Sequence, residues 1–252
     1  MLLTVDLNCD MGESFGAWTM GTDAELMDFV SSINVACGFH AGDASVMRKT
    51  IEMAIEKNIA VGAHPGFPDL QGFGRRQMQM SPEEIFDIVL YQVGALKGMC
   101  EAFGTRLHHV KPHGALYNQA ATDASLAAAI AAAVKAIDAD LIFYGLSNSF
   151  LISEAERIKL KTASEVFADR TYQANGTLTA RAEPNALIEI VEKSVEQILE
   201  MVTRRIVSAT NGEKISIKAD TICIHGDGAH ALEFARAIKR SLQENNILIR
   251  AA

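Results

Sequence analysis

Residues 3–13 read LTVDLNCDMGE, a short apolar run that ends in polar side chains and a glycine turn. The same order of features recurs six more times along the chain. The seven apolar runs span Leu3–Leu7, Ile33–Cys37, Ala60–Ala63, His108–Val110, Leu141–Tyr144, Ala163–Phe167 and Thr221–Ile224. Runs this short and this rich in Val and Ile are typical of strands that are buried on both faces of a parallel sheet.

Amphipathic helical patterns separate these runs. Thr22-x-x-Glu25 and Ser81-x-x-Glu84 match the capping box that starts a helix, and Pro82 stands at a first helical position. A regular alternation of strand and helix implies parallel strands joined by right-handed crossovers. The pattern therefore predicts the α/β class and a TIM-barrel-like (β/α) barrel of seven strands, one fewer than the usual eight.

The 252 residues contain no linker, low-complexity tract or shift in composition, which predicts a single barrel domain over residues 1–252. Asn211-Gly212 lies between two apolar stretches. This dipeptide favours a tight hairpin turn, so we expect a β-hairpin insertion near residues 206–218.

Composition excludes several classes of protein. The net charge of −8 argues against binding to nucleic acid or to an anionic membrane surface. No apolar run approaches the roughly 18 residues of a membrane span, and the first residues lack the basic start of a signal peptide. The four cysteines form no C-x-x-C pair and predict neither a disulfide framework nor a zinc–cysteine site. We expect a soluble cytoplasmic protein.

Polar side chains gather where the predicted strands end. They are Asp6, Asn8 and Asp10 at the first strand, His40 and Asp43 after the second, His64 after the third, Lys111 and His113 at the fourth, Asp169 and Arg170 after the sixth, and His225 and Asp227 after the seventh. The carboxyl ends of parallel barrel strands share one face, where active sites are built. The sequence thus predicts one shared cleft, although Asp43 serves equally well as a helix N-cap.

Two of these groups have a specific chemical meaning. Asp6, Asn8 and Asp10 share one face of a strand, and a buried carboxylate there requires a cation or hydrogen-bond donors, which indicates a catalytic or metal-related role. Lys111 and His113 also share a face and suit an oxyanion or a phosphate, although a salt bridge to Asp6 or Asp10 would use Lys111 just as well.

Two long turns lie beside the predicted cleft. Pro65–Gln77 carries Arg75 and Arg76, and Arg170–Arg181 carries further basic side chains. Loops of this length are usually functional, and basic residues above a carboxylate-rich site suit an anionic substrate, although an exposed arginine needs no such reason. The chain contains no G-x-x-x-x-G-K-S/T phosphate loop, dinucleotide fingerprint, G-x-S-x-G elbow or H-E-x-x-H motif.

Six blocks of the sequence together resemble the LamB/YcsF family. They are DLNCDMGE at 6–13, NVACGFHAGD at 34–43, GAHPG at 62–66, VKPHGALY at 110–117, EVFADR at 165–170 and CIHGD at 223–227. The resemblance implies a barrel like that of the glycoside hydrolase/deacetylase superfamily. It also implies the activity of the A subunits of bacterial 5-oxoprolinases, which is the ATP-dependent hydrolysis of 5-oxo-L-proline to L-glutamate with partner subunits B and C.

The resemblance and the strand-end pattern lead to one set of predicted site residues. The predicted catalytic residues are Asp6, Asn8, Asp10, Lys111, His113, Asp169 and Arg170. The predicted substrate-binding residues are His40, His64, Arg75, Tyr117, His225 and Asp227. The deacetylase superfamily holds a divalent metal with one Asp and two His, and the nearest matches here are Asp6 or Asp10, with His40 and His64; we take Asp10 as the carboxylate.

ATP with Mg²⁺ is the expected co-substrate. An unstrained lactam is a poor electrophile, and phosphorylation of its oxygen would activate it toward water, which requires a base and cations that bind phosphate, for example Lys111 or Arg170. Two other hypotheses remain. The chain is a stand-alone metal-dependent amide or carbohydrate deacetylase, or it is a non-catalytic protein that only presents 5-oxoproline to its partners.

Overall fold

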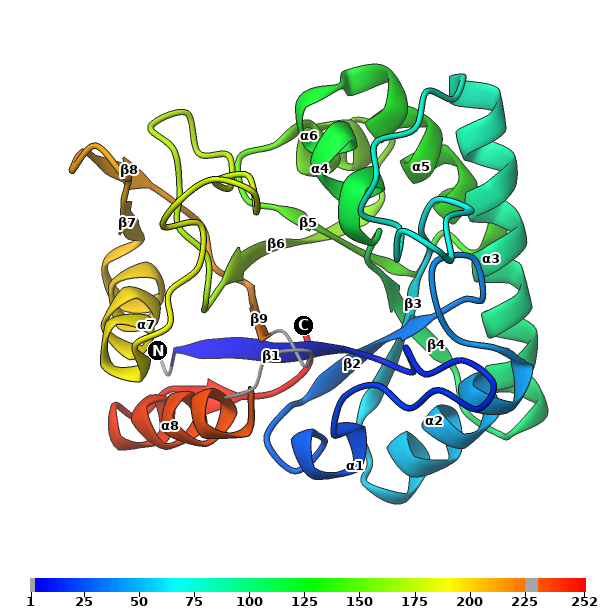
Figure 1. Cartoon of the computed structure of the whole chain (residues 1–252), viewed down its shortest axis with the longest axis horizontal. Coiled ribbons are helices and arrows are strands. Elements are labelled where there is room, and N and C mark those ends of the chain that lie inside the picture. Colours follow the sequence, from blue (N-terminus) through cyan, green and yellow to red (C-terminus); the bar gives the residue numbers. More distant parts are fainter. Residues whose placement is uncertain (1–2, 225–230) are drawn as a thin grey trace.

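Seven parallel strands close into a barrel in the computed structural model, which describes residues 3–224 and 231–252 (Figure 1). The barrel strands are β1 (Thr4–Met11), β2 (Ser32–Ala36), β3 (Ala60–His64), β4 (Leu107–Val110), β5 (Ile142–Leu146), β6 (Lys161–Phe167) and β9 (Thr221–Ile224). Strand β9 pairs with β6 on one side and with β1 on the other, which closes the barrel. The predicted seven-stranded α/β barrel is confirmed.

Helices cover the outside of the barrel (Figure 1). They are α1 (Asp23–Leu26), α2 (Ala44–Glu56), α3 (Pro82–Ala102), α4 (Gly114–Thr122), α5 (Ala124–Ile137), α6 (Phe150–Arg157), α7 (Val191–Leu199) with a π-helical turn at Glu200–Arg204, and α8 (Ala231–Glu244). In α3 the residues at helical spacing, from Ile85 through Val89, Val93 and Leu96 to Cys100, are all fully buried. Burial of this stripe fixes α3 against the barrel wall.

Three short strands lie outside the barrel. Strand β10 (Leu248–Ile249) extends the sheet beside β1, whereas β7 (Ile206–Ser208) and β8 (Lys214–Ser216) form a separate antiparallel hairpin. Among the described helices, no single one is long and apolar enough to cross a membrane; only the pair α4 and α5, bent by 119°, passes that test jointly. All four cysteines are buried and free.

The two predicted capping boxes differ in outcome. Ser81 and Glu84 form the full box, in which each side chain accepts a hydrogen bond from the backbone N–H of the other residue. The prediction at Thr22 is wrong, because its side chain makes no capping hydrogen bond. Its helix is only four residues long, and the neighbouring Asp23 carboxylate instead accepts the N–H of Gly12 and so orders the turn after β1.

Asp43 is the N-cap of α2. Its carboxylate accepts the N–H groups of Ser45 and Val46 at 2.8 and 2.9 Å, and its second oxygen accepts the N–H of Gly16. These bonds explain why the pKa of Asp43 lies below its ordinary value, since backbone N–H groups stabilise the charged form. The helix-cap alternative therefore accounts for this residue.

Polar side chains fill the barrel interior. The imidazole of His109 is fully buried, stacks on Tyr144 at 4.0 Å and bonds the side-chain oxygen of Asn34 at 2.8 Å. A Cβ atom at Gly62 would lie 2.1 Å from Nε2 of this ring, so only glycine leaves space for it. A hydrogen-bonded imidazole thus occupies the place of an aliphatic core layer and links the barrel interior to the site above it.

Candidate active site

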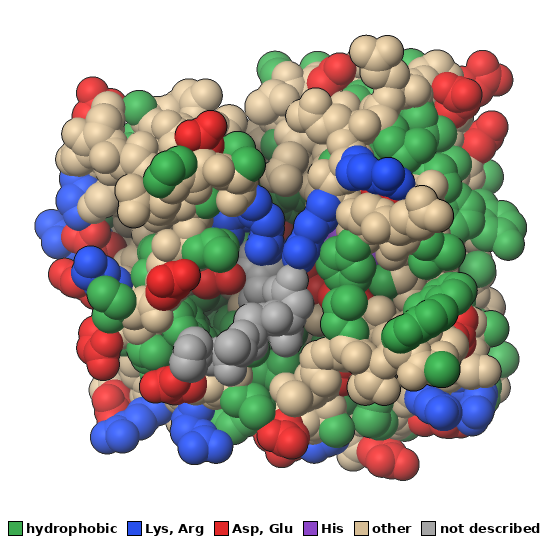
Figure 2. Space-filling model, viewed as in Figure 1, with side chains coloured by type: hydrophobic (Ala, Val, Ile, Leu, Met, Phe, Trp, Pro, Cys, Tyr) green, Lys and Arg blue, Asp and Glu red, His purple; other side chains and the backbone are tan. Residues whose placement is uncertain are grey.

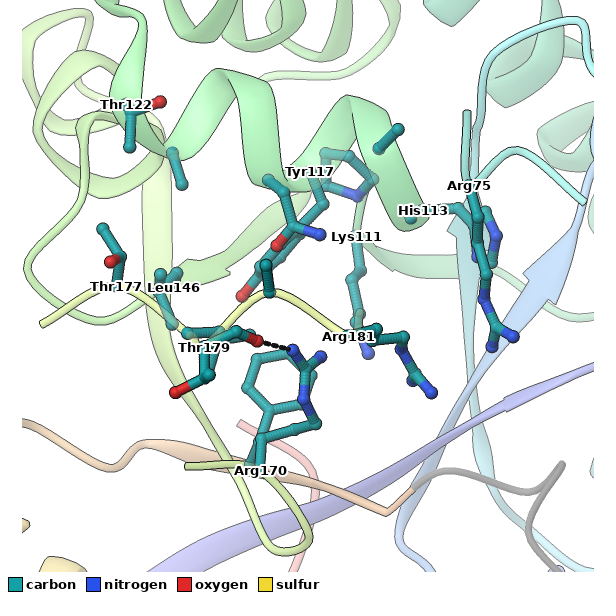
Figure 3. Close-up of a pocket in the computed structure, with 18 of the residues that line it drawn as sticks. Arg75, Lys111, His113, Tyr117, Thr122, Leu146, Arg170, Thr177, Thr179 and Arg181 are labelled. Carbon is teal, nitrogen blue, oxygen red and sulfur yellow. Dashed lines mark hydrogen bonds between the residues drawn. The ribbon is translucent and has the colours of Figure 1, made fainter. Parts of the chain in front are cut away.

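A cavity of about 690 Å³ opens at the carboxyl ends of the strands (Figure 3). Seven of the predicted site residues line it: Asp10, His64, Arg75, Lys111, His113, Tyr117 and Arg170. His40 lies behind His113, with the two rings stacked at 3.7 Å. His225 and Asp227 fall outside the described residues. The shared cleft that the strand ends predict is thus built from five different strands and the loops that follow them.

Lys111 is the centre of a buried ion cluster. Its Nζ lies 2.9 Å from Asp10 Oδ1 and 3.0 Å from Glu165 Oε1, and it contacts Cys223 Sγ at 3.0 Å. Burial opposes the charge on this ammonium, but the neighbouring carboxylates outweigh it and hold the pKa of Lys111 well above its ordinary value. Of the two alternatives for Lys111, the salt bridge to Asp10 is therefore the one that the structure shows.

Glu165 connects the ion cluster to the pocket wall. Its side chain is fully buried, accepts the Tyr117 hydroxyl at 2.7 Å and accepts the Asn8 amide at 3.0 Å. Burial, and after it the charge of Glu165, raises the pKa of Tyr117 well above its ordinary value, so the phenol stays protonated and donates. Asn8 also accepts from Asn34 and from Lys111, and so fixes both members of the ion pair.

Two predicted catalytic residues lie away from the cavity lining. Asp6 is buried in the barrel interior, where its carboxylate accepts the hydroxyl groups of Ser31, Ser32 and Thr221 at 2.6 to 2.8 Å. Asp169 contributes its backbone oxygen, which accepts the N–H of Ile188 and orders the loop after β6. In this structure both residues support the site rather than line the pocket.

Glu13, His40, His64 and His113 form a compact cluster beside the ion pair. One ligand atom from each lies within 4.8 Å of the others. The separation is 2.9 Å between His64 Nε2 and His113 Nδ1, 3.5 Å between His40 Nε2 and Glu13 Oε1, and 3.7 Å between His113 Nδ1 and Glu13 Oε1. The predicted metal residues His40 and His64 belong to this cluster, and Asp10 lies next to it, 3.2 Å from His64 Nε2.

Hydrogen bonds to backbone carbonyl groups fix the tautomers of two of these histidines. His64 Nδ1 lies 2.7 Å from the oxygen of Lys111, and His113 Nε2 lies 2.8 Å from the oxygen of Phe73. A carbonyl oxygen only accepts, so these nitrogens carry the protons, and in the neutral rings the lone pairs of His64 Nε2 and His113 Nδ1 face each other. Two lone pairs 2.9 Å apart repel unless a cation, either a proton or a metal ion, lies between them.

His40 adds a second sign of a ligand. It is 1% exposed, and neither ring nitrogen has a hydrogen-bond partner among the described residues. Burial, then the nearby rings of His113 and His64, lowers its pKa well below the ordinary value, so the imidazole is neutral and its lone pair is available. Gly66 and Gly74 allow this close packing, because a Cβ atom on either would lie 2.7 Å from His40.

These observations fit a transition metal such as zinc. With Zn–N distances of about 2.0–2.1 Å, ligand atoms of a tetrahedral site lie roughly 3.4 Å apart, which the three separations bracket. Backbone carbonyl groups that orient ligating histidines are typical of metal sites, and imidazole ligands favour zinc over magnesium. The site also holds three carboxylates, those of Asp10, Glu13 and Glu165, against the single ammonium of Lys111, so it carries a formal charge that a divalent cation would balance.

Three arginines from two loops line the outer part of the cavity (Figure 3). Arg170 is buried and donates to the backbone oxygens of Thr179 and Ala186, so it holds its own loop in place. Burial, then the nearby charge of Arg181, lowers its pKa to about 10. Arg75 and Arg181 are both exposed, and the Arg75 guanidinium lies over the ring of Phe73, 4.8 Å from its centroid.

Glu13 and Glu165 were absent from the predicted site residues. Glu165 interrupts the apolar run Ala163–Phe167, and a carboxylate inside a doubly buried strand is a signal that could have marked it. Glu13 lies three residues past Asp10 in a glycine turn, where nothing in the local pattern distinguishes it from a surface acid.

The buried neutral histidines predict that stability falls in mild acid. Burial lowers the pKa values of His40, His109 and His113 well below 6.5. Between the unfolded value near 6.5 and these lower folded values, only the unfolded chain binds the protons. Each histidine therefore costs roughly 1.4 kcal/mol of stability per pH unit as the pH falls through this window.

Denaturant unfolding at pH 7.5, 6.5 and 5.5, in a chelator that keeps metal off the histidines, measures this slope. His109→Gln retains a donor toward Asn34 and should flatten the slope by one histidine's share. A free energy of unfolding that stays level or rises toward pH 5.5 would show that these rings are protonated in the folded protein.

Comparison with known proteins gives consistent results. A family model described as LamB/YcsF family matches residues 5–252. A protein of Tolumonas auensis that is named as the A subunit of 5-oxoprolinase is 61% identical over 247 residues, 98% of each chain, and one of the same name from Bacillus subtilis is 55% identical over 250 residues, 99% of this chain and 97% of that one. The crystal structure of a lactam utilization protein from Thermus thermophilus superposes with a TM-score of 0.94 at 44% identity, covering 99% of this chain and all of that one.

Proposed function

The chain belongs to the LamB/YcsF family, and from this premise we propose that it is the lactam-hydrolysing A subunit of an ATP-dependent 5-oxoprolinase. The observation that carries the proposal is the pocket floor, where the ion cluster of Asp10, Lys111 and Glu165 adjoins the four-residue cluster of Glu13 and three histidines. A floor of this kind can activate water beside a bound amide. Relatives at 55–61% identity bear the name of this activity.

The reaction follows from the chemistry of an unstrained lactam. Transfer of the γ-phosphoryl group of ATP to the lactam oxygen releases ADP and turns that oxygen into a leaving group. One water then adds to the ring carbon and the C–N bond breaks, with the nitrogen leaving as the amine. A second water cleaves the resulting acyl phosphate, so one ATP and two waters yield glutamate, ADP and phosphate.

We assign the base to Asp10. Lys111 and Asn34 hold its Oδ1 at 2.9 and 2.8 Å, and its Oδ2 is directed toward His64. A carboxylate fixed in this way can take a proton from water, and a positioned base contributes about 100- to 10,000-fold. Lys111 keeps Asp10 ionised, and Asn8 with Glu165 holds Lys111 in register.

We assign a divalent metal to Glu13, His40, His64 and His113. When bound, such an ion supplies Lewis-acid polarisation and lowers the pKa of water. The other assigned roles belong to the wall of the pocket. Tyr117 shapes the ring-binding side through its bond to Glu165, and Asp169 with Arg170 sets the loop that carries Arg181.

We propose that subunits B and C supply the ATP step. The sequence contains no phosphate loop for ATP and its Mg²⁺. ATP binding is therefore placed on the assembled complex, with 5-oxo-L-proline in the pocket described above. A cytoplasmic location fits a reaction that consumes ATP and a chain with four free thiols.

Glutamate formation from 5-oxo-L-proline and ATP tests this proposal. We expect turnover when the chain is combined with coexpressed subunits B and C, and little or none from the chain alone. Robust ATP-coupled turnover by the single chain would contradict the division of labour. The histidine cluster also favours a second candidate, a stand-alone metal-dependent deacetylase; chelator-sensitive amide hydrolysis by the pure chain without ATP would select it.

A further inference from the structure

The charges in the pocket are divided between its floor and its mouth. The lining carboxylates among the described residues are Asp10 and Glu13, and both lie at the floor, at the end of β1 and just after it. The mouth carries the guanidinium groups of Arg75, Arg170 and Arg181, from the loops after β3 and β6 (Figure 3). Figure 2 shows Lys and Arg side chains gathered around the hollow in this face. An anionic group is therefore repelled by the floor and attracted to the mouth.

Lys111 is already engaged with two carboxylates and cannot serve as the main anion-binding cation. Its Nζ lies 2.9 Å from Asp10 and 3.0 Å from Glu165 at 2% exposure. Arg170 likewise spends donors on two backbone oxygens. Arg75 and Arg181 remain as the exposed guanidinium groups at the mouth, and the charges of both act on Arg170, which places all three close together.

We infer that Arg75 and Arg181 form a phosphoryl-binding clamp, so that this chain receives its lactam already phosphorylated. This inference rests on the proposed function and names the substrate class of the same site. Two guanidinium forks match the several oxygens of a dianion better than the two oxygens of one carboxylate.

Size and charge support a phosphorylated ligand. The cavity of about 690 Å³ falls in the range of roughly 300–1,000 Å³ that accommodates drug-sized ligands, and so exceeds the needs of one small ring. A phosphorylated 5-oxoproline carries a carboxylate and a phosphoryl dianion, three negative charges in total. The three guanidinium groups at the mouth balance that charge, whereas unmodified 5-oxoproline would leave two of them uncompensated.

Binding of inorganic phosphate to the full chain tests the clamp. Calorimetry in a chelator at low salt removes any metal that phosphate could bind directly. Arg75→Gln and Arg181→Gln should each weaken phosphate binding by about 10- to 100-fold, the effect of one lost charge-assisted hydrogen bond. The matched control is Arg157→Gln, which removes one exposed arginine paired with Glu154 on α6 and should leave binding unchanged.

Acetate and 5-oxo-L-proline, used as probes in the same titrations, separate a phosphoryl clamp from a carboxylate site. Their binding should change by less than about 3-fold in the two variants, because one carboxylate needs only one guanidinium fork. Equal losses for phosphate and acetate, or unchanged phosphate binding, would overturn the inference. The proposed function fails separately: if the complex with subunits B and C makes no glutamate, that proposal is wrong even where phosphate binding depends on both arginines.

Discussion

Lys111→Met is expected to destabilise the protein by about 3–5 kcal/mol, the cost of removing one partner from a buried ion pair. Methionine keeps the aliphatic stem but leaves Asp10 and the fully buried Glu165 without the ammonium that lies 2.9 and 3.0 Å from them. Glutamate formation per folded molecule should also fall by at least about 100-fold, because Asp10 loses the contact that holds it as a base. Denaturant unfolding and the coupled assay with subunits B and C measure the two effects.

A second substitution distinguishes uncompensated charge from lost packing. Glu165→Gln in the Lys111→Met background removes one of the stranded carboxylates while the amide retains an oxygen toward Tyr117. The double variant should regain part of the lost stability and none of the activity. A loss below about 1 kcal/mol for Lys111→Met alone would mean that the two carboxylates are protonated in the folded protein.

His40→Leu should abolish metal binding without unfolding the chain. The imidazole is 1% exposed and makes no hydrogen bond to a described residue, so leucine removes two buried polar atoms that cost roughly 1–3 kcal/mol when they have no partner. In chelator the variant should be at least as stable as the wild type. With zinc added, the Tm of the wild type should rise and that of the variant should not, because three ligands replace four.

Metal content after dialysis, together with glutamate formation, completes this test. His108→Gln is the matched control, because His108 is half-buried, lies outside the cluster and should leave the zinc response intact. Equal metal content in wild type and His40→Leu would instead identify the four side chains as a group that shares a proton.

Local patterns were sufficient to predict the barrel and the residues that close each strand. The seven apolar runs became the seven barrel strands, and the groups at their carboxyl ends, from Asp10 to His113, converge on one cavity. The parallel arrangement follows from the alternation with helices and needs no long-range information.

The partners of each site residue could not be predicted, because they depend on the register of strands far apart in the sequence. Lys111 suits a phosphate by its residue type, but the barrel places it against Glu165, whose strand lies two positions further around the barrel wall. Asp6 and Asp10 lie on one face of β1, yet three hydroxyl groups bind the first and an ammonium binds the second. Glu13 joined the histidines only through the turn geometry after β1.

The pairing of β1 with β9 has a consequence for how the protein is made. Strand β1 is synthesised first, but its neighbour at Thr221–Ile224 comes near the end of the chain, and contacts such as Asn8 to Thr221 span 213 residues. Until β9 leaves the ribosome, β1 and β6 each carry an unpaired strand edge, which is prone to aggregation. We therefore expect folding to be slow, governed by this final ring closure and dependent on chaperones, with the ion cluster around Lys111 completed last.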